Sequence, residues 1–215
     1  PVKSLIVLTT VLSEPQSVKI QSTVKGVKNI VLVHGAFADG SSWSKVIEQL
    51  QSKDYNVIAV QNPLTSLADD VLAAKRAISL MDGPVLLVAH SYGGMVISEA
   101  GNDPKVAGLL YVAALVPEDG QSANDVNAAM PTTGVEKEFK VSTDGFVFLS
   151  QKAVNENFVP DASPGEKNLI YATQVPLAAS AGTEQVQSPA WNTKPSWYAV
   201  AEQDKMINSD LERYK

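Results

Sequence analysis

The sequence contains no cysteine and only two histidines, His34 and His90. Without cysteine the chain can form no disulfide, thiolate nucleophile or cysteine-ligated metal site, and two histidines are too few for most zinc sites. No phosphate-binding loop or dinucleotide fingerprint occurs either. We therefore expect neither a metal nor a cofactor.

Positive charge is also scarce. The chain has 17 lysines and arginines against 23 acidic residues, a formal net charge of -6, and the basic residues are scattered along it. Proteins that bind nucleic acids cluster Lys and Arg where they contact phosphates. This balance argues against a nucleic-acid partner.

Long hydrophobic runs are missing as well. The run Leu5–Leu12 is far shorter than the roughly 20 residues of a membrane span, so we expect none. It follows Lys3 and precedes the polar stretch Ser13–Thr23, which resembles the end of a secretory signal peptide followed by a linker within residues 1–28. Val, Ile, Leu and Thr equally suit a first β-strand. Export and a cytoplasmic location both stay open.

What the sequence does contain is an alternation of strands and helices. Apolar residues make up 45% of the chain, enough for one sizeable core. The β-rich runs Asn29–Val33, Tyr55–Val60, Pro84–Val88 and Val106–Val116 alternate with amphipathic patterns that begin at Ser42, Ser66 and Tyr92 and end near Asp54, Gly83 and Gly101. The first helical pattern places Trp43, Val46, Ile47 and Leu50 on one face. This order predicts an α/β fold with a mostly parallel sheet flanked by helices.

The alternation stops after Pro117. About 75 residues pass before the next strand-like run, Trp197–Val200, which is too long for a plain connection. We expect a cap inserted at about 118–192 into a single domain, 29–215. Within it, Asp144-Gly145 predicts a hairpin with a type I′ turn, and Ser163 to Glu166 predicts a capped helix start.

Ser91 is the candidate nucleophile. It lies in Val88-Ala-His-Ser-Tyr-Gly-Gly94, where a buried strand turns directly into a helix. Small residues two positions before and after such a serine allow the sharp turn of a nucleophile elbow, written G-x-S-x-G. Here these positions are Ala89 and Gly93, so alanine replaces the first glycine. A helix-capping serine beside packing glycines is the alternative.

A second segment, Leu32-Val-His-Gly-Ala-Phe-Ala-Asp-Gly-Ser-Ser-Trp43, follows an earlier strand. With the elbow, it resembles the α/β-hydrolase family, in particular small esterases akin to plant methylesterases and hydroxynitrile lyases. The resemblance covers about residues 29–215. It implies an oxyanion hole formed by the backbone N–H groups of Tyr92 and of Ala36 or Phe37, with His34, Gly35, His90 and Gly93 as structural residues at the site. Ser41 and Ser42 are expected to be a loop residue and a helix cap.

The resemblance also implies an acid after the penultimate strand, where Asp204 lies. Glu118 and Asp119, after the previous strand, are the reserve candidates. In this fold the catalytic groups follow the chain order Ser, Asp, His, so the histidine is expected some tens of residues beyond Asp204. Neither His34 nor His90 substitutes well. We therefore expect the printed sequence to be a fragment that lacks the last strand and helix with that histidine, and to be inactive or nearly so on esters.

These features predict hydrolysis of small carboxylic esters by a serine nucleophile through an acyl-enzyme. The larger apolar residues of the cap would favour a substrate with an apolar part. They are Phe139, Phe146, Phe148, Phe158, Tyr171 and Trp191, most of which we expect in the core of the cap. Two alternatives stay open: a hydroxynitrile-lyase-like proton-transfer enzyme and a non-catalytic small-molecule receptor on the same fold. The sequence does not specify an oligomeric state.

Overall fold

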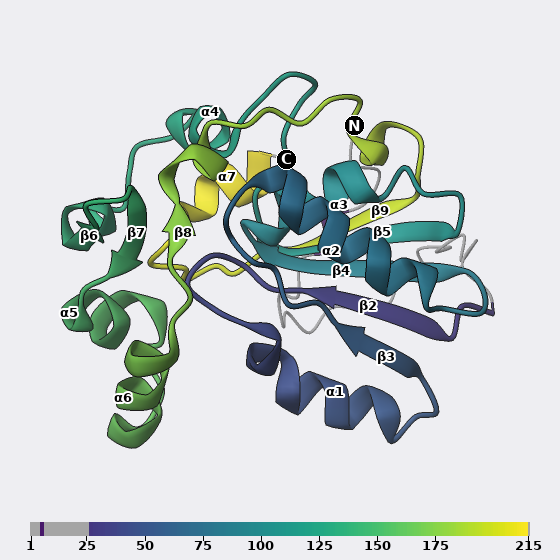
Figure 1. The fold of residues 1–215 in the computed structure, drawn as a ribbon, viewed down its shortest axis with the longest axis horizontal. Coiled ribbons are helices and arrows are strands. Elements are labelled where there is room, and N and C mark those ends of the chain that lie inside the picture. The colour runs from purple at the N-terminus through teal and green to yellow at the C-terminus, as the bar shows by residue number, and fades with distance from the viewer. Residues whose placement is uncertain (1–4, 7–25, 215) are drawn as a thin grey trace, which may run out of the picture.

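The computed structural model describes residues 5–6 and 26–214 (Figure 1). In this part of the chain six strands form the main sheet, which is parallel and has the order β1-β9-β5-β4-β2-β3. The parallel sheet predicted from the alternation is confirmed. The strands are β1 (Leu5–Ile6), β2 (Asn29–Val33), β3 (Asn56–Ala59), β4 (Val85–Ser91), β5 (Val106–Ala114) and β9 (Ser196–Ala199).

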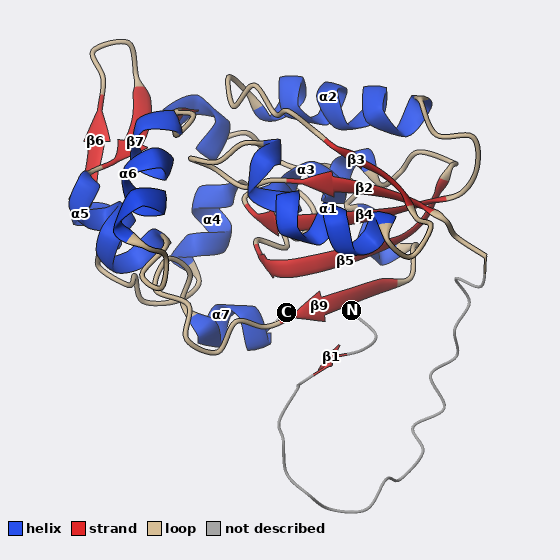
Figure 2. Cartoon of the chain, turned by 90° about the horizontal axis from the view of Figure 1, so that it is seen from below, coloured by secondary structure: helices blue, strands red, loops and turns tan. Residues whose placement is uncertain are grey.

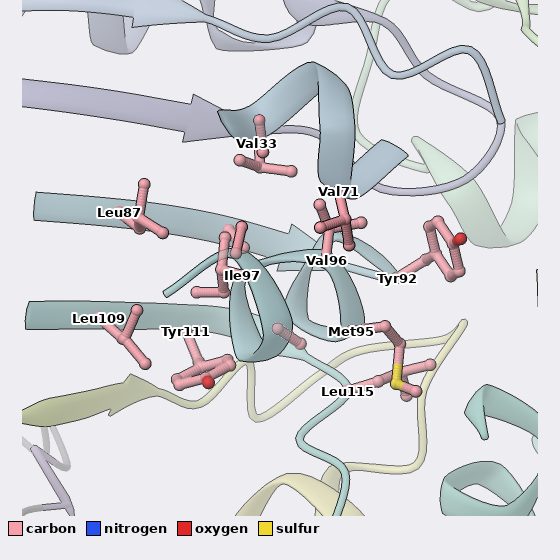
Figure 3. Close-up of a cluster of buried hydrophobic side chains, with 14 of the residues drawn as sticks. Val33, Val71, Leu87, Tyr92, Met95, Val96, Ile97, Leu109, Tyr111 and Leu115 are labelled. Atoms are coloured by element: carbon pink, nitrogen blue, oxygen red, sulfur yellow. The ribbon is translucent and has the colours of Figure 1, made fainter. Parts of the chain in front are cut away.

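Helices cover both faces of this sheet. Leu87 and Leu109 point to one face, where they pack with residues of α2 (Leu67–Ser79) and α3 (Gly93–Ala100), as Figure 3 shows. Ile30 and Val88 point to the other face, toward the partly buried side chains of α1 (Ser44–Gln51). Every residue of β2 is buried, as expected for a strand covered on both sides.

The strand order contains a switch point. The chain runs from β2 to its neighbour β3, then crosses back to β4 on the other side of β2. The loops that leave the carboxyl ends of β2 and β4 therefore diverge to opposite sides of the sheet. In open α/β sheets ligands bind in the crevice at such a point. His34-Gly35 and Ser91 both lie there.

The segment between β5 and β9 lies at the carboxyl ends of the strands (Figure 2). Its antiparallel sheet has the order β6-β7-β8, formed by β6 (Phe139–Val141), β7 (Phe146–Leu149) and β8 (Leu177–Ala178). Its helices are α4 (Ala123–Ala128), α5 (Gln151–Ala153), α6 (Pro164–Thr173), the π-helix η3 (Val154–Phe158) and the 3-10 turns η2 (Val135–Glu138), η4 (Ala179–Gly182) and η5 (Ala190–Asn192). The predicted capping box is present, since the Ser163 and Glu166 side chains each bond the other residue's backbone.

Several local predictions are wrong in detail. The first helix is preceded by the 3-10 turn η1 (Gly40–Trp43), whose cap is Asp39 and not Ser42. Val46 is exposed and does not face the sheet. The second helix ends at Ser79, well before Gly83. Its C-cap residue, Leu80, has a right-handed helical backbone conformation, so no glycine is required there.

The hairpin turn also differs from the prediction. A type I′ turn requires a positive φ at both central residues, but only Gly145 has one, at 85°. Ser142 is the reason: its N–H donates to the Phe146 carbonyl, and its carbonyl accepts from the Gly145 N–H. The loop is thus longer than two residues, with a single left-handed glycine at its end.

Of the apolar run Leu5–Leu12, the structure describes Leu5–Ile6, which pair in parallel with Tyr198 and Ala199 of β9. This supports the strand interpretation for these two residues. The rest of the run, and Ser13–Thr23, lie outside the described residues. Among the described helices, none has the length and apolar character required to cross a bilayer.

Candidate active site

Ser91 lies where β4 turns directly into α3. Its backbone has a φ of 54°, a left-handed conformation that is costly for a residue other than glycine and is concentrated at functional sites. The turn is held by β5, because the Leu115 N–H donates to the Ser91 carbonyl over 3.0 Å. The side chain is half-buried, and its hydroxyl forms no hydrogen bond with a described residue. The predicted sharp turn is therefore present.

The two glycines after this turn are required by close packing. A β-carbon on Gly93 would lie 2.8 Å from the carbonyl oxygens of both Val33 and His34. One on Gly94 would overlap the carbonyl oxygen of Leu115. The sequence indicated the need for Gly93, whereas Gly94 was missed because the elbow pattern does not include it. Both glycines allow α3 to start directly against the ends of β2 and β5.

The loop after β2 lies directly against Ser91. A β-carbon on Gly35 would lie 2.7 Å from the Ser91 Cβ and 3.2 Å from its Oγ. Further along this loop, Phe37 has a φ of 64°, an outlier for a bulky residue. Its ring is buried against Phe139 and Phe158 of the cap, at centroid distances of 5.7 and 6.5 Å. The cap thus fixes the conformation of this loop.

Backbone N–H groups are available on both sides of Ser91. In the described part of the chain, no acceptor takes a hydrogen bond from the N–H of Ala36, Phe37 or Tyr92. Two fixed donors aimed at one point stabilise the oxyanion of an acyl-transfer transition state. This geometry supports the assignment of the three residues to an oxyanion hole.

Both ring nitrogens of His34 form hydrogen bonds within the protein. Its Nε2 accepts a hydrogen bond from the Asn62 N–H over 2.9 Å, so Nδ1 carries the proton and donates to the Gly35 carbonyl over 2.8 Å. Burial lowers the pKa of the imidazole, which keeps it neutral. Because both ring nitrogens are occupied, the geometry supports a structural role.

His90 lies one residue before the candidate nucleophile and is paired with Val112 of β5. No described residue forms a hydrogen bond with its ring. Burial lowers the pKa of the His90 imidazole, and the negative charge of Asp204 partly opposes this shift. His90 is thus an uncharged side chain near the candidate acid.

Asp204 lies in the loop after β9, at the sheet edge that also carries Ser91. Its Oδ1 accepts hydrogen bonds from the N–H groups of Met206 (2.7 Å) and Ile207 (2.9 Å). These bonds orient the carboxylate, and no described residue bonds its Oδ2. Asp204 therefore has the geometry to accept a hydrogen bond from an imidazole.

A second carboxyl group lies near Asp204. Glu212, on α7 (Ser209–Tyr214), is only 1% exposed, and its Oε2 accepts from the Ala201 N–H over 2.7 Å. Burial raises the pKa of Glu212 to about 7, and the charge of Asp204 adds to this shift. The sequence analysis did not single out Glu212, since nothing in its pattern indicates burial.

The remaining candidates lie away from this arrangement or have other partners. Glu118 and Asp119 are exposed, and Asp119 accepts a hydrogen bond from the Ser188 N–H over 2.6 Å. Ser41 and Ser42 are also exposed and belong to the η1 turn. Of the potential metal ligands, the described residues form no group of three or more His, Asp or Glu that could hold an ion.

The aromatic residues of the cap divide between several environments. Phe139 and Phe158 surround Phe37, while the Trp191 indole packs in the main core and donates to the Pro117 carbonyl over 2.8 Å. Tyr171 is 36% exposed. Phe146 packs partly buried against the main core, and Phe148 is also partly buried. Only Trp191 of the six is buried, and it lies in the main core, so the expectation that most of them form the core of the cap is not met.

We expect Gly35→Ala to lower kcat/KM for ester hydrolysis at least tenfold, because its methyl group would displace Ser91 and a misplacement of about 1 Å can cost about 10²-fold. The fall in Tm should stay within a few degrees, since overpacking costs about 1–3 kcal/mol. Gly165→Ala is the matched control, because its β-carbon would meet nothing within 4 Å. Equal activity of the two variants, measured in protein from the complete coding sequence, would contradict this placement of the loop.

Comparison of the sequence with those of known proteins identifies several relatives of this chain. The model of the family described as "Alpha/beta hydrolase family" matches residues 30–215. The chain is 26% identical over 200 residues to a probable hydrolase from Phoma sp., covering 84% of this chain and 79% of that protein. It is 34% identical over 110 residues to a carbendazim hydrolyzing esterase from Nocardioides sp. (44% of this chain, 45% of that protein). It is 34% identical over 108 residues to methylesterase 7 from Arabidopsis thaliana (42% and 41%).

Solved structures with the same fold include two hydrolases. An extracellular α/β-hydrolase from a Paenibacillus species superposes with a TM-score of 0.72 at 20% identity, covering 85% of this chain and 81% of that one. A pyrethroid hydrolase from Sphingobium faniae gives a TM-score of 0.73 at 20% identity, covering 87% and 83%. At this identity the likeness concerns the fold.

Proposed function

The chain belongs to the alpha/beta hydrolase family, and we propose that it hydrolyses small carboxylic esters with Ser91 as the nucleophile. The observation that carries the proposal is the close approach of the Gly35 loop to the strained turn at Ser91. This approach places the loop that carries the unbonded N–H groups of Ala36 and Phe37 beside the Ser91 hydroxyl. Two of the relatives named above are esterases, which supports this class of substrate.

The proposed reaction has two halves. The Ser91 Oγ attacks the ester carbonyl carbon while a base takes its proton, and the carbonyl oxygen becomes an oxyanion held by the N–H of Tyr92 and of Ala36 or Phe37. The intermediate then expels the alcohol, which takes the proton from the base. Water, activated by the same base, attacks the acyl-enzyme and releases the acid.

Asp204 is proposed to orient the base and to stabilise its protonated form. The proposed base is a histidine, which in this fold follows the acid in chain order. Its hydrogen bond would go to the Oδ2 of Asp204, because Oδ1 already accepts two backbone N–H groups.

The substrate is proposed to be a small ester with an apolar acyl or alcohol part. The loop that approaches Ser91 continues into Phe37, whose surroundings in the cap are the apolar side chains Phe139, Val154 and Leu177. Such a wall favours apolar groups.

A serine-directed fluorophosphonate tests the proposed nucleophile. We expect it to modify one residue of the protein made from the complete coding sequence, on the tryptic peptide 77–105. This peptide also carries Ser79 and Ser98, so fragment ions must place the label. A label on Ser79, on Ser98 or on a different peptide would contradict the assignment of Ser91.

A further inference from the structure

Asp70, on α2, is a carboxylate inside the main core, with 0% of its surface exposed. Its Oδ1 accepts a hydrogen bond from the Leu64 N–H over 2.8 Å, and its Oδ2 accepts one from the Tyr92 hydroxyl over 3.0 Å. Burial raises the pKa of Asp70 to about 6, and the nearby acids Asp69 and Glu184 add to this shift. The group is thus mainly ionised at pH 7.5, held by these two hydrogen bonds.

A buried carboxylate without a paired cation is costly. Only carboxylates contribute charge to the pKa shift of Asp70, and they oppose its ionised form. A leucine or methionine at this position would extend the apolar face that Leu67, Val71 and Ala74 already present. The carboxylate is thus desolvated at a cost, and what it provides in return is two hydrogen bonds, one to the buried Leu64 N–H and one to the Tyr92 hydroxyl. The second bond points to a function through Tyr92.

That residue is Tyr92, which follows Ser91 in the chain. Its side chain is 3% exposed and lies at one end of the core cluster shown in Figure 3. The φ of 54° at Ser91 is strained, and such a conformation persists only where the surroundings determine it. The hydrogen bond from the Tyr92 phenol to the Asp70 carboxylate fixes Tyr92, the residue that directly follows Ser91. A charged acceptor makes such a bond stronger than a neutral one.

Asp70 is itself held rigidly. Leu64, which donates to it, is fully buried with a φ of 57°. The Leu64 carbonyl accepts a hydrogen bond from the N–H of Ala178 in β8 over 2.8 Å. The fully buried carboxylate is thus linked by hydrogen bonds to Tyr92 after the turn at Ser91 and, through Leu64, to a strand of the cap segment.

We propose that Asp70 is a positioning residue for hydrolysis, which holds the Tyr92 side chain and thereby aims the Tyr92 backbone N–H at the oxyanion. The inference rests on the proposed function. An oxyanion donor acts mainly in the transition state, so loss of its alignment lowers kcat while KM changes little.

The test compares Tyr92→Phe, Asp70→Asn and the double variant, in protein from the complete coding sequence. Each assay uses a p-nitrophenyl ester, with rates divided by the concentration of titrated active sites. Complete loss of an oxyanion donor costs about 10²–10³ in kcat. We expect about a tenfold loss for each single variant, with KM within twofold. The double variant should lose no more than the worse single one, since both changes break one hydrogen bond.

Tyr111→Phe is the matched control. Tyr111, on β5, is also a fully buried tyrosine, and its hydroxyl bonds the hydroxyl of Ser98 on α3 over 2.9 Å, with no contact to Asp70. We expect this variant to lose Tm to a similar extent as Tyr92→Phe and to keep kcat within twofold. A merely structural role of the Asp70 bond would make the two Phe variants equivalent in kcat.

The outcomes separate the two proposals. If Tyr92→Phe keeps kcat within twofold while Ser91→Ala is inactive, or if the two losses multiply in the double variant, the positioning role is wrong and the hydrolase function stands. If Ser91→Ala retains activity, the proposed function itself fails. Should Asp70→Asn not fold, the comparison of Tyr92→Phe with Tyr111→Phe decides alone.

Discussion

Replacing Ser91 by alanine is expected to lower kcat for p-nitrophenyl acetate by about 10⁴-fold or more, the scale on which triad enzymes lose activity without their nucleophile. A residual rate of about 10³–10⁴ over water would remain from the oxyanion donors and substrate binding. The Tm should change little, because the Ser91 hydroxyl bonds no described residue. KM should stay within a few-fold of the wild-type value, since the pocket walls are intact.

Ser41→Ala is the control for this experiment. Ser41 is an exposed serine of the loop that starts at Gly35, and the sequence marks it as a loop residue. We expect its kcat to be unchanged. Loss of activity in Ser41→Ala with retention in Ser91→Ala would move the nucleophile to the other loop and refute the elbow assignment.

The same assay separates the hydrolase from the two other functions considered for this fold. A hydroxynitrile-lyase-like enzyme would also need the Ser91 hydroxyl, but it would release no acid from an ester. A receptor would bind small apolar molecules without consuming them. Acid release that depends on Ser91 is therefore diagnostic of hydrolysis.

The sheet and the turn at Ser91 were predictable because they follow local rules. A β-branched run buried on both faces, followed by small residues and a helical pattern, has few other solutions. The proximity of Gly35 to Ser91 followed from strand order, which the sequence implies only through the family resemblance. The 2.7 Å approach itself comes from the parallel pairing of β2 with β4, two strands distant in the sequence, and is not encoded in any short segment.

Asp70 shows why the rest could not be predicted. Its position beside Asp69 in the first turn of α2 is typical of the acids that favour helix N-termini. Asp69 is such an acid, since it is exposed and its N–H is capped by Ser66. Asp70 instead lies on the buried face of α2, together with Val71 and Ala74. A charged residue on an apolar stripe was the available signal, but its partner Tyr92 is distant in the sequence.

Replacing Asp204 by asparagine is expected to lower kcat about 10³–10⁴-fold, because Asn keeps the size of the side chain but cannot stabilise a protonated imidazole. The amide oxygen can still accept from the N–H groups of Met206 and Ile207, so the loop and the Tm should be nearly preserved. The amide NH₂ of asparagine would take the place of Oδ2 and face the histidine base. Because this NH₂ donates a hydrogen bond, it would disfavour the histidine tautomer in which Nδ1 carries the proton.

Two measurements make this prediction specific to Asp204. The pKa of His90, followed by NMR, should fall in Asp204→Asn, because the carboxylate charge that raises it is removed. Asp119→Asn should keep both kcat and the His90 pKa, since Asp119 is an exposed carboxylate bonded to the Ser188 backbone. If Asp119→Asn lost activity and Asp204→Asn kept it, the acid would be the one that follows β5. An unchanged His90 pKa with lost activity would show that Asp204 is needed but does not lie where the structure has it.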